Sequence, residues 1–126
     1  MTKQKQLLTS LLERNKDAVI IGSLGTISYD LKEIEHPNKI LIKGAMGAAI
    51  ACGIGYAMGT DKKVIVFIGE GALLMKLGST SSLAHHDLDN LEIHVMVNHN
   101  YKSCGGQPNY FRKWSKKPYI LTCHEV

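Results

Sequence analysis

Short runs rich in Val and Ile, separated by helix-length segments, are the feature that most constrains how this chain can fold. The runs at 18–23, 39–44, 63–69 and 91–98 have the composition of buried strands, and 119–126 forms a last one after a longer loop. The intervening segments predict helices over 28–34, 46–59 and 72–86, while an N-terminal helix carries its apolar stripe at Leu7, Leu8, Leu11 and Leu12. Because strands buried on both faces and joined by helices are typical of parallel sheets, we predict an α/β fold with helices on both faces. Residues 1–126 are expected to form one domain.

Charge and cysteine content exclude several classes of function. The net charge is +4, but the basic residues are scattered. Their densest cluster favours a solvated loop over a nucleic-acid patch, and it contains Arg112, Lys113, Lys116 and Lys117 beside Trp114. No run reaches the roughly 18 apolar residues of a membrane span, so neither a nucleic acid nor a membrane is the expected partner. Three cysteines without CxxC spacing argue against a disulfide framework or zinc site and favour the cytoplasm.

Glycines mark the places where the predicted strands end. They occur in the stretches 22–28, 43–47 and 69–71, at the edge of a parallel sheet where ligands bind. Neither a G-x-G-x-x-G fingerprint nor a P-loop is present. Close packing of helix 46–59 on the sheet is the alternative explanation for Gly47, Gly53 and Gly55.

One carboxylate and one amide follow two consecutive strands. Glu70 ends the run 63–69, and Asn98 ends the next run. If the two strands are neighbours, both side chains reach the same edge and supply oxygen ligands of the kind that Mg²⁺ prefers. The N-terminus of helix 72–86 would point its amides at the same place and favour a diphosphate. In the alternative interpretation, Glu70 caps that helix and the Asn pair closes a turn.

The same residues resemble the signature of thiamine-diphosphate enzymes. Gly69-Glu70-Gly71 and Asn98 match its glycine-flanked acid and following asparagine, and the stretches GAMGAAIACGIGYAMG, GALLMKLGS and YKSCGGQPN resemble phosphonopyruvate and sulfopyruvate decarboxylases. GGQP is the most specific of these, and the resemblance covers 18 to about 109. It implies the diphosphate-binding fold of these enzymes, shortened after GGQPN.

The resemblance also implies a role for individual residues. Mg²⁺ would be bound by the side chains of Glu70 and Asn98 and by the backbone carbonyl of Asn100. The diphosphate would meet the strand end at Gly69, the backbone amides of Gly71 and Ala72, and Ser28, with Thr26 as a second candidate. Gly44 would accept a hydrogen bond from the aminopyrimidine, and Met46 would support the bent cofactor. Helix N-capping remains the alternative role for Thr26 and Ser28.

Several positions depart from the family pattern. Glu70 stands where the family usually has Asp, and His99 and Lys102 stand at Gly-like positions. We expect His99 to be a solvent-facing turn residue, with contact to the cofactor pocket as the alternative. Lys102, Ser103 and Gln107 are either contacts for an anionic substrate group or parts of a structured loop.

The family implies a decarboxylase in which thiamine diphosphate, with Mg²⁺, carries the chemistry. The glutamate that activates this cofactor belongs to a pyrimidine-binding domain that these 126 residues do not resemble. We therefore predict a carboxy-lyase subunit for a small 2-oxo acid, inactive alone and forming a hetero-oligomer with a separate pyrimidine-binding chain. The alternatives are a non-catalytic cofactor-binding remnant, an interaction module that uses the helix after Gly44, and a carboligase or acyl-transfer subunit.

Overall fold

A parallel five-stranded sheet forms the centre of the chain. The computed structural model describes residues 1–102, 105–111 and 121–126. The strand order is β2-β1-β3-β4-β5, and every neighbouring pair is parallel. The strands are β1 (Val19–Gly22), β2 (Lys39–Leu41), β3 (Val64–Gly69), β4 (Leu91–Val97) and β5 (Thr122–Glu125). The predicted α/β fold is confirmed, although residues 119–120 of the last predicted strand lie outside the described part.

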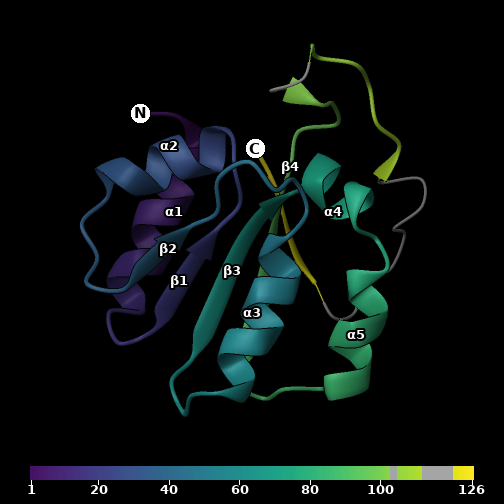
Figure 1. The fold of residues 1–126 in the computed structure, drawn as a ribbon. Helices are drawn as coiled ribbons and strands as arrows, with labels where there is room; N and C mark the ends of the chain where they lie inside the picture. The colour runs from purple at the N-terminus through teal and green to yellow at the C-terminus, as the bar shows by residue number, and fades with distance from the viewer. Residues whose placement is uncertain (103–104, 112–120) are drawn as a thin grey trace.

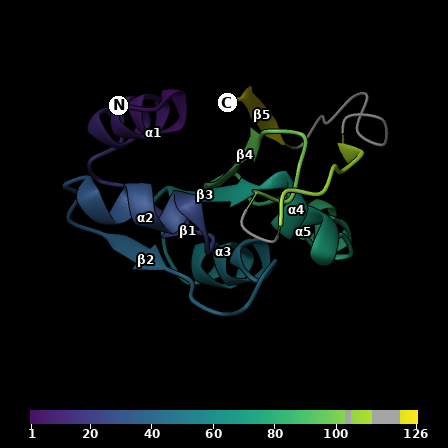
Figure 2. The same cartoon turned by 90° about the horizontal axis from the view of Figure 1, so that it is seen from above.

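Helices cover both faces of this sheet (Figures 1 and 2). On one face, α1 (Lys3–Arg14) and α2 (Thr26–Glu33) bury Leu8, Leu12 and other apolar side chains against β1 and β3. On the other face lie α3 (Ala49–Met58), α4 (Glu70–Met75) and α5 (Ser79–His86). The predicted leucine stripe therefore packs inward, with Leu7 and Leu11 partly buried beside the two fully buried leucines. None of the described helices is long and apolar enough to cross a membrane.

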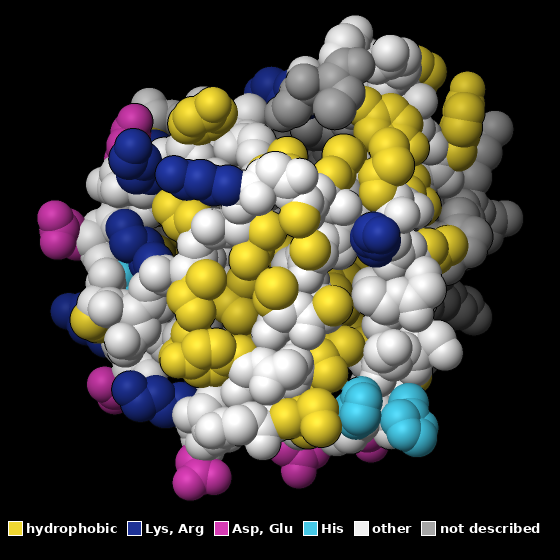
Figure 3. Space-filling view, viewed as in Figure 1, with side chains coloured by type: hydrophobic (Ala, Val, Ile, Leu, Met, Phe, Trp, Pro, Cys, Tyr) yellow, Lys and Arg dark blue, Asp and Glu magenta, His cyan; other side chains and the backbone are white. Residues whose placement is uncertain are grey.

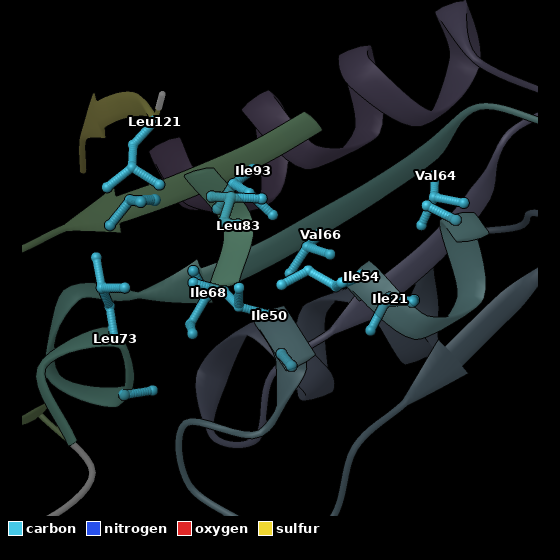
Figure 4. Close-up of a cluster of buried hydrophobic side chains, with 14 of the residues drawn as sticks. Ile21, Ile50, Ile54, Val64, Val66, Ile68, Leu73, Leu83, Ile93 and Leu121 are labelled. Carbon is cyan, nitrogen blue, oxygen red and sulfur yellow. The ribbon is translucent and has the colours of Figure 1, made fainter. Parts of the chain in front are cut away.

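The larger core lies between α3 and the centre of the sheet (Figure 4). Ile50 and Ile54 of α3 meet Val66 of β3 there. A Cβ atom on Gly53 would stand 2.4 Å from the Val66 side chain, so this glycine allows the helix to approach the strand closely. Close packing is thus confirmed as the role of Gly53. It is wrong for Gly55, which is exposed and has no neighbouring atom within 4 Å of its Cβ position.

The outward face of α3 is apolar as well. No residue of Ala49–Met58 is charged, and Ala51, Cys52, Tyr56 and Met58 are exposed. Figure 3 shows apolar side chains gathered on the face of the molecule that α3 occupies. A helix that is apolar all round is usually covered on both sides. The exposed apolar face of α3 therefore supports the alternative of an interaction module.

The predicted helix 72–86 is wrong as a continuous element. It begins earlier, at Glu70, and is interrupted between α4 and α5. The hydroxyls of Ser79 and Thr80 each donate 2.7 Å hydrogen bonds to the carbonyls of Lys76 and Leu77, three residues before them. Such side-chain bonds compete with the helical pattern and explain the interruption. Helix α3 likewise begins at Ala49 rather than 46, because Gly47 has a φ of 89°.

The order of the strands decides where a ligand site can form. The chain runs outward from β1 to β2 and then returns to place β3 on the other side of β1. At such a reversal the connections leave the sheet on opposite faces, and a crevice opens beyond the carboxyl ends of the strands. The segments after β1, β3 and β4 meet at this crevice.

Candidate functional site

A small hollow lies beyond the carboxyl ends of β1, β3 and β4. Its volume is about 70 Å³. The segments that surround it are the start of α4, the loop after β4, the beginning of α2 and the N-terminal helix. The lining residues are Gln4, Leu24, Thr26, Ile27, Met46, Gly69, Glu70, Gly71, Ala72, Met96, Asn98, Asn100, Tyr101 and Lys102. The hollow thus combines most of the residues singled out in the sequence.

Among the described residues that line the hollow, Glu70 is the only acidic one. It is the first residue of α4 and 1% exposed. Its two carboxylate oxygens accept hydrogen bonds from the backbone N–H of Asn98, at 2.9 and 3.1 Å, and one also accepts from the N–H of His99 at 3.3 Å. This meeting depends on the pairing of β3 with β4, in which Gly69 lies opposite Met96. The predicted proximity of Glu70 and Asn98 is confirmed, whereas Glu70 is not the helix cap, a position held by Gly69.

The loop after β4 is shaped by an unusual backbone conformation. His99 has a φ of 68°, in the left-handed region that side chains other than glycine seldom adopt. Two consecutive N–H groups, those of Asn98 and His99, converge on the Glu70 carboxylate, as backbone amides do around a bound anion. The side-chain oxygen of Asn98 also accepts the N–H of Asn100 at 3.2 Å, so the Asn pair closes a turn in addition to lining the hollow.

The His99 ring points away from this turn. Its side chain is 59% exposed, and its Nε2 lies 2.9 Å from an oxygen of Glu125. The expectation of a solvent-facing turn residue is therefore confirmed.

The negative charge of Glu70 has no cationic partner in residues 1–102, 105–111 and 121–126. Buried charges are ordinarily paired with an opposite charge or bound to a metal ion. Its oxygens have acceptor capacity left, because a carboxylate offers about four lone-pair sites. Glu70, Asn98 and Asn100 line the same hollow, and together they present the hard oxygen ligands that suit Mg²⁺. The side chains present therefore fit this metal.

Two of the predicted cofactor contacts lie elsewhere. Gly44 is exposed and does not line the hollow, although its φ of 73° fits a glycine. Ser28 does not line it either; its hydroxyl is buried without a hydrogen-bond partner among the described residues. Thr26, the second candidate, does line the hollow and accepts a 3.4 Å hydrogen bond from Gln4. Neither hydroxyl residue caps α2, whose N-cap is Gly25.

Lys102 and Gln107 have separate positions in the following loop. Lys102 is exposed at the rim of the hollow. Gln107 is exposed and uses its backbone carbonyl to accept the N–H of Tyr101 at 2.8 Å, which supports the structured-loop interpretation. Ser103 and the basic cluster around Trp114 lie outside the described residues.

Sequence reasoning missed five residues that line the hollow: Gln4, Leu24, Ile27, Met96 and Tyr101. Gln4 reaches it from α1 and donates a 2.8 Å hydrogen bond to Asp30 of α2. Tyr101 places its ring beside Gly71. Nothing in the local sequence signals the docking of α1, but an aromatic residue three positions after Asn98 is a visible signal for Tyr101.

A second polar cluster is centred on strand β4, away from the hollow. His94 of β4 is 6% exposed, with its Nε2 3.1 Å from Glu92 and its Nδ1 2.9 Å from Nε2 of His124. The two imidazole rings are stacked, with their centroids 5.2 Å apart. The other oxygen of Glu92 is 2.5 Å from the ammonium of Lys63.

The pKa values of two groups in this cluster, Glu92 and His124, are shifted. Burial raises the pKa of Glu92, but the hydrogen bonds and charges of Lys63 and His94 outweigh it, and the resulting pKa is below its usual range. Partial burial, followed by the charge of His94, lowers the pKa of His124. Every acidic and basic group of this cluster therefore has a partner within it.

Comparisons with known proteins agree with the geometry. The chain is 35% identical over 98 residues to a phosphonopyruvate decarboxylase from Streptomyces viridochromogenes, covering 77% of this chain and 25% of that protein. It is 34% identical over 104 residues to the sulfopyruvate decarboxylase subunit beta from Methanothermobacter thermautotrophicus, covering 82% and 55%. The chain thus spans about a quarter to a half of the length of these relatives.

A solved structure has the same fold. The 2-oxoglutarate:ferredoxin oxidoreductase from Magnetococcus marinus superposes with a TM-score of 0.66 at 19% identity, over 84% of this chain and 37% of that one. Residues 21–121 match the family described as thiamine pyrophosphate enzyme, C-terminal TPP binding domain. The chain belongs to this family of thiamine-diphosphate-binding domains.

Proposed function

We propose that this chain is the diphosphate-binding subunit of a thiamine-diphosphate-dependent 2-oxo acid decarboxylase of the sulfopyruvate and phosphonopyruvate type. The observation that carries the proposal is the buried Glu70 carboxylate beside Asn98, at the carboxyl ends of two adjacent parallel strands. The names of the relatives supply the reaction class. We also propose the cytoplasm as its compartment, on the cysteine pattern.

The proposed metal site consists of Glu70, Asn98 and Asn100. The two side chains and the Asn100 backbone carbonyl would bind Mg²⁺, which ordinarily completes its octahedron with water and phosphate oxygens. The one carboxylate leaves a net positive charge on the metal. That charge would hold the diphosphate of the cofactor.

The proposed cofactor site is a backbone surface. Gly69, Gly71 and Ala72 would face the diphosphate, because the first N–H groups of α4 have no partner within the helix. Met46 lines the hollow from the loop before α3 and would support the thiazole side. Ser28 and Gly44 remain proposed contacts only if their segments shift on binding, since neither lines the hollow.

When bound, thiamine diphosphate supplies the electron sink for decarboxylation of a 2-oxo acid. This chain's part is to fix the metal, orient the diphosphate and exclude water through the apolar side chains around the hollow. Lys102, exposed at the rim, would attract the acidic substrate.

The partner is proposed to be a separate pyrimidine-binding chain. Three relatives are named as a sulfopyruvate decarboxylase subunit beta, a name that implies a second subunit in those proteins. By analogy, the groups that would activate the cofactor are expected on such a second chain. The active site would then lie at the interface of a hetero-oligomer.

Calorimetric titration of the chain with thiamine diphosphate, in Mg²⁺ and then in EDTA, tests the proposed binding site. We expect binding in Mg²⁺ only, and a loss of at least about tenfold in affinity for Glu70→Gln, which keeps the shape of the side chain but removes its charge. Glu92→Gln, on the neighbouring strand and outside the hollow, is the matched control and should bind like the natural chain. Equal binding by Glu70→Gln would contradict the proposed metal site.

The reaction itself is tested on the native complex. Native mass spectrometry of the protein isolated from its own cells, with cofactor and Mg²⁺ in the buffer, should reveal a second chain. CO₂ release from sulfopyruvate and phosphonopyruvate should require that complex. Decarboxylation by the isolated chain would contradict the split active site.

One observation favours the second candidate, a cofactor-binding remnant. The Glu70 oxygens already accept hydrogen bonds from two backbone N–H groups, and these donors reduce its attraction for a metal ion. A complex that binds the cofactor with Mg²⁺ but releases no CO₂ from any 2-oxo acid would support this candidate.

A further inference from the structure

The hollow is too small for the molecule that it is proposed to bind. Its volume is about 70 Å³, whereas pockets for small organic ligands begin at roughly 300 Å³. A side chain that lies over the α4 backbone would account for part of this difference. Most lining residues belong to strands or helices, and the others come from the loops after β1, before α3 and after β4.

Tyr101 is that side chain. A Cβ atom on Gly71 would lie 2.7 Å from Cδ1 and 3.0 Å from Cε1 of the Tyr101 ring. Side-chain carbons do not approach this closely, so the ring can lie there only because residue 71 is glycine. It covers the part of the α4 backbone that the proposed function assigns to the diphosphate.

Backbone hydrogen bonds on both sides fix the position of Tyr101. Its N–H donates to the carbonyl of Gln107 at 2.8 Å, and its own carbonyl accepts the N–H of Gly106 at 3.0 Å. One residue earlier, Asn100 forms an antiparallel bridge with Pro108. The backbone is thus held at both of its polar groups, whereas no hydrogen bond among the described residues involves the Tyr101 hydroxyl.

We propose that the Tyr101 ring occupies the place of the cofactor diphosphate over Gly71 and swings aside when the cofactor binds. This inference rests on the proposed function and adds to it a residue that sets cofactor affinity. In the free chain, only the fraction of molecules with the ring displaced is competent to bind, so the ring lowers the apparent affinity.

Substitution of Tyr101 tests the inference by its effect on affinity. Tyr101→Ala empties the place over Gly71, and we expect thiamine diphosphate with Mg²⁺ to bind roughly five- to tenfold more tightly, because no ring has to be displaced. Tyr101→Phe is the matched control: it keeps the ring, and its affinity should stay within about twofold of the natural chain. Unchanged or weaker binding by Tyr101→Ala would overturn the inference.

A double-mutant cycle tests the contact without any ligand. Gly71→Ala should lower the melting temperature when Tyr101 is present and much less in the Tyr101→Ala chain, since the added methyl group meets only the ring at short distance. Gly69→Ala is the control, because its Cβ would have no neighbour within 4 Å, and it should show no coupling to Tyr101. Additive effects of Gly71→Ala and Tyr101→Ala would overturn the proposed ring position.

The two measurements separate this inference from the proposed function. If neither the natural chain nor Tyr101→Ala binds thiamine diphosphate at millimolar concentration with Mg²⁺, the proposed function fails and the inference fails with it. If the natural chain binds and Tyr101→Ala binds no better, only the inference fails. A shift of the Tyr101 ring signal in the NMR spectrum on addition of the cofactor, assigned by its loss in Tyr101→Phe, is expected if both hold.

Discussion

Two carboxylates near β4 are held in opposite ways. Glu92 lies between Lys63 and His94, so its charge is balanced by groups of the chain itself. Glu70 is more deeply buried, and among the described residues its carboxylate is held by the N–H groups of Asn98 and His99, which carry no net charge. The difference shows that, among the described residues, the charge of Glu92 is balanced within the chain, whereas the charge of Glu70 is left for the proposed cation to balance.

The largest contrast is expected when each carboxylate is removed. Glu70→Ala leaves the partly buried N–H groups of Asn98 and His99 without their acceptor, and we expect the free energy of unfolding to fall by about 1–3 kcal/mol. Glu92→Ala should cost at most about 1 kcal/mol, because its side chain is 39% exposed. Urea titration followed by circular dichroism measures both. Equal costs would remove the distinction between the two sites.

Shortening Glu70 sharpens the comparison further. In Glu70→Asp the carboxylate draws back from the amides of Asn98 and His99, and we expect a loss of about 1–2 kcal/mol in stability. The same change frees the charge for the metal, so half-maximal cofactor binding should need less Mg²⁺. Calorimetric titrations at stepped Mg²⁺ concentrations give this value. A higher Mg²⁺ requirement would show that the longer side chain suits the site better.

Mild acid should lower the stability of the fold through the Glu92 cluster. The folded-state pKa of His124 is below its unfolded value of about 6.5, so the unfolded chain takes up more protons between these values. Stability should therefore be complete above pH 6.5 and decline as the pH falls below it. The lowered pKa of Glu92 adds a loss only below about pH 4.5.

The measurement for this pH effect is a series of melting temperatures from pH 8 to pH 5. His124→Gln removes the titrating ring and should flatten the decline near pH 6. An unchanged profile in this variant would assign the decline to another group.

The smallest effects are expected at His99. His99→Gly removes the strain of the left-handed backbone at this position, which is worth about 1 kcal/mol. The same change removes the exposed contact of the imidazole with Glu125. His99→Ala loses the same contact and keeps the strain. The glycine variant should therefore be more stable than the alanine variant by about 1 kcal/mol, as measured by urea titration. A more stable alanine variant would argue that the loop tolerates this conformation without cost.

The parts of the fold that depend on short-range pattern were predictable. Apolar runs predicted the five described strands, although β2 ends at Leu41 rather than at 44 and β5 contains neither Val nor Ile. The spacing of Glu70 and Asn98 predicted that they would meet, because the ends of parallel neighbouring strands share an edge. The break after α4 was missed because Ser79 and Thr80 compete with the helix through their hydroxyls, which apolar periodicity does not register.

The remainder depends on tertiary docking. Gln4 reaches the hollow because α1 packs beside α2, and no local pattern specifies that placement. Ser28 was misplaced for the same reason, since the docking of α2 turns Thr26 toward the hollow and Ser28 away from its lining. Residues at strand ends were thus predictable, whereas those brought in by helix packing were not.

The parallel pairing of β3 and β4 has a consequence for the order in which the protein forms. During synthesis, β3 leaves the ribosome well before β4, so the edge of β3 that pairs with β4 is unpaired until β4 has been made. The carboxylate of Glu70 meets its second donor, the N–H of His99, only when a residue 29 positions later has been made. The ligand site is therefore assembled by the same late step that completes the sheet, and a nascent chain stalled before β4 has neither.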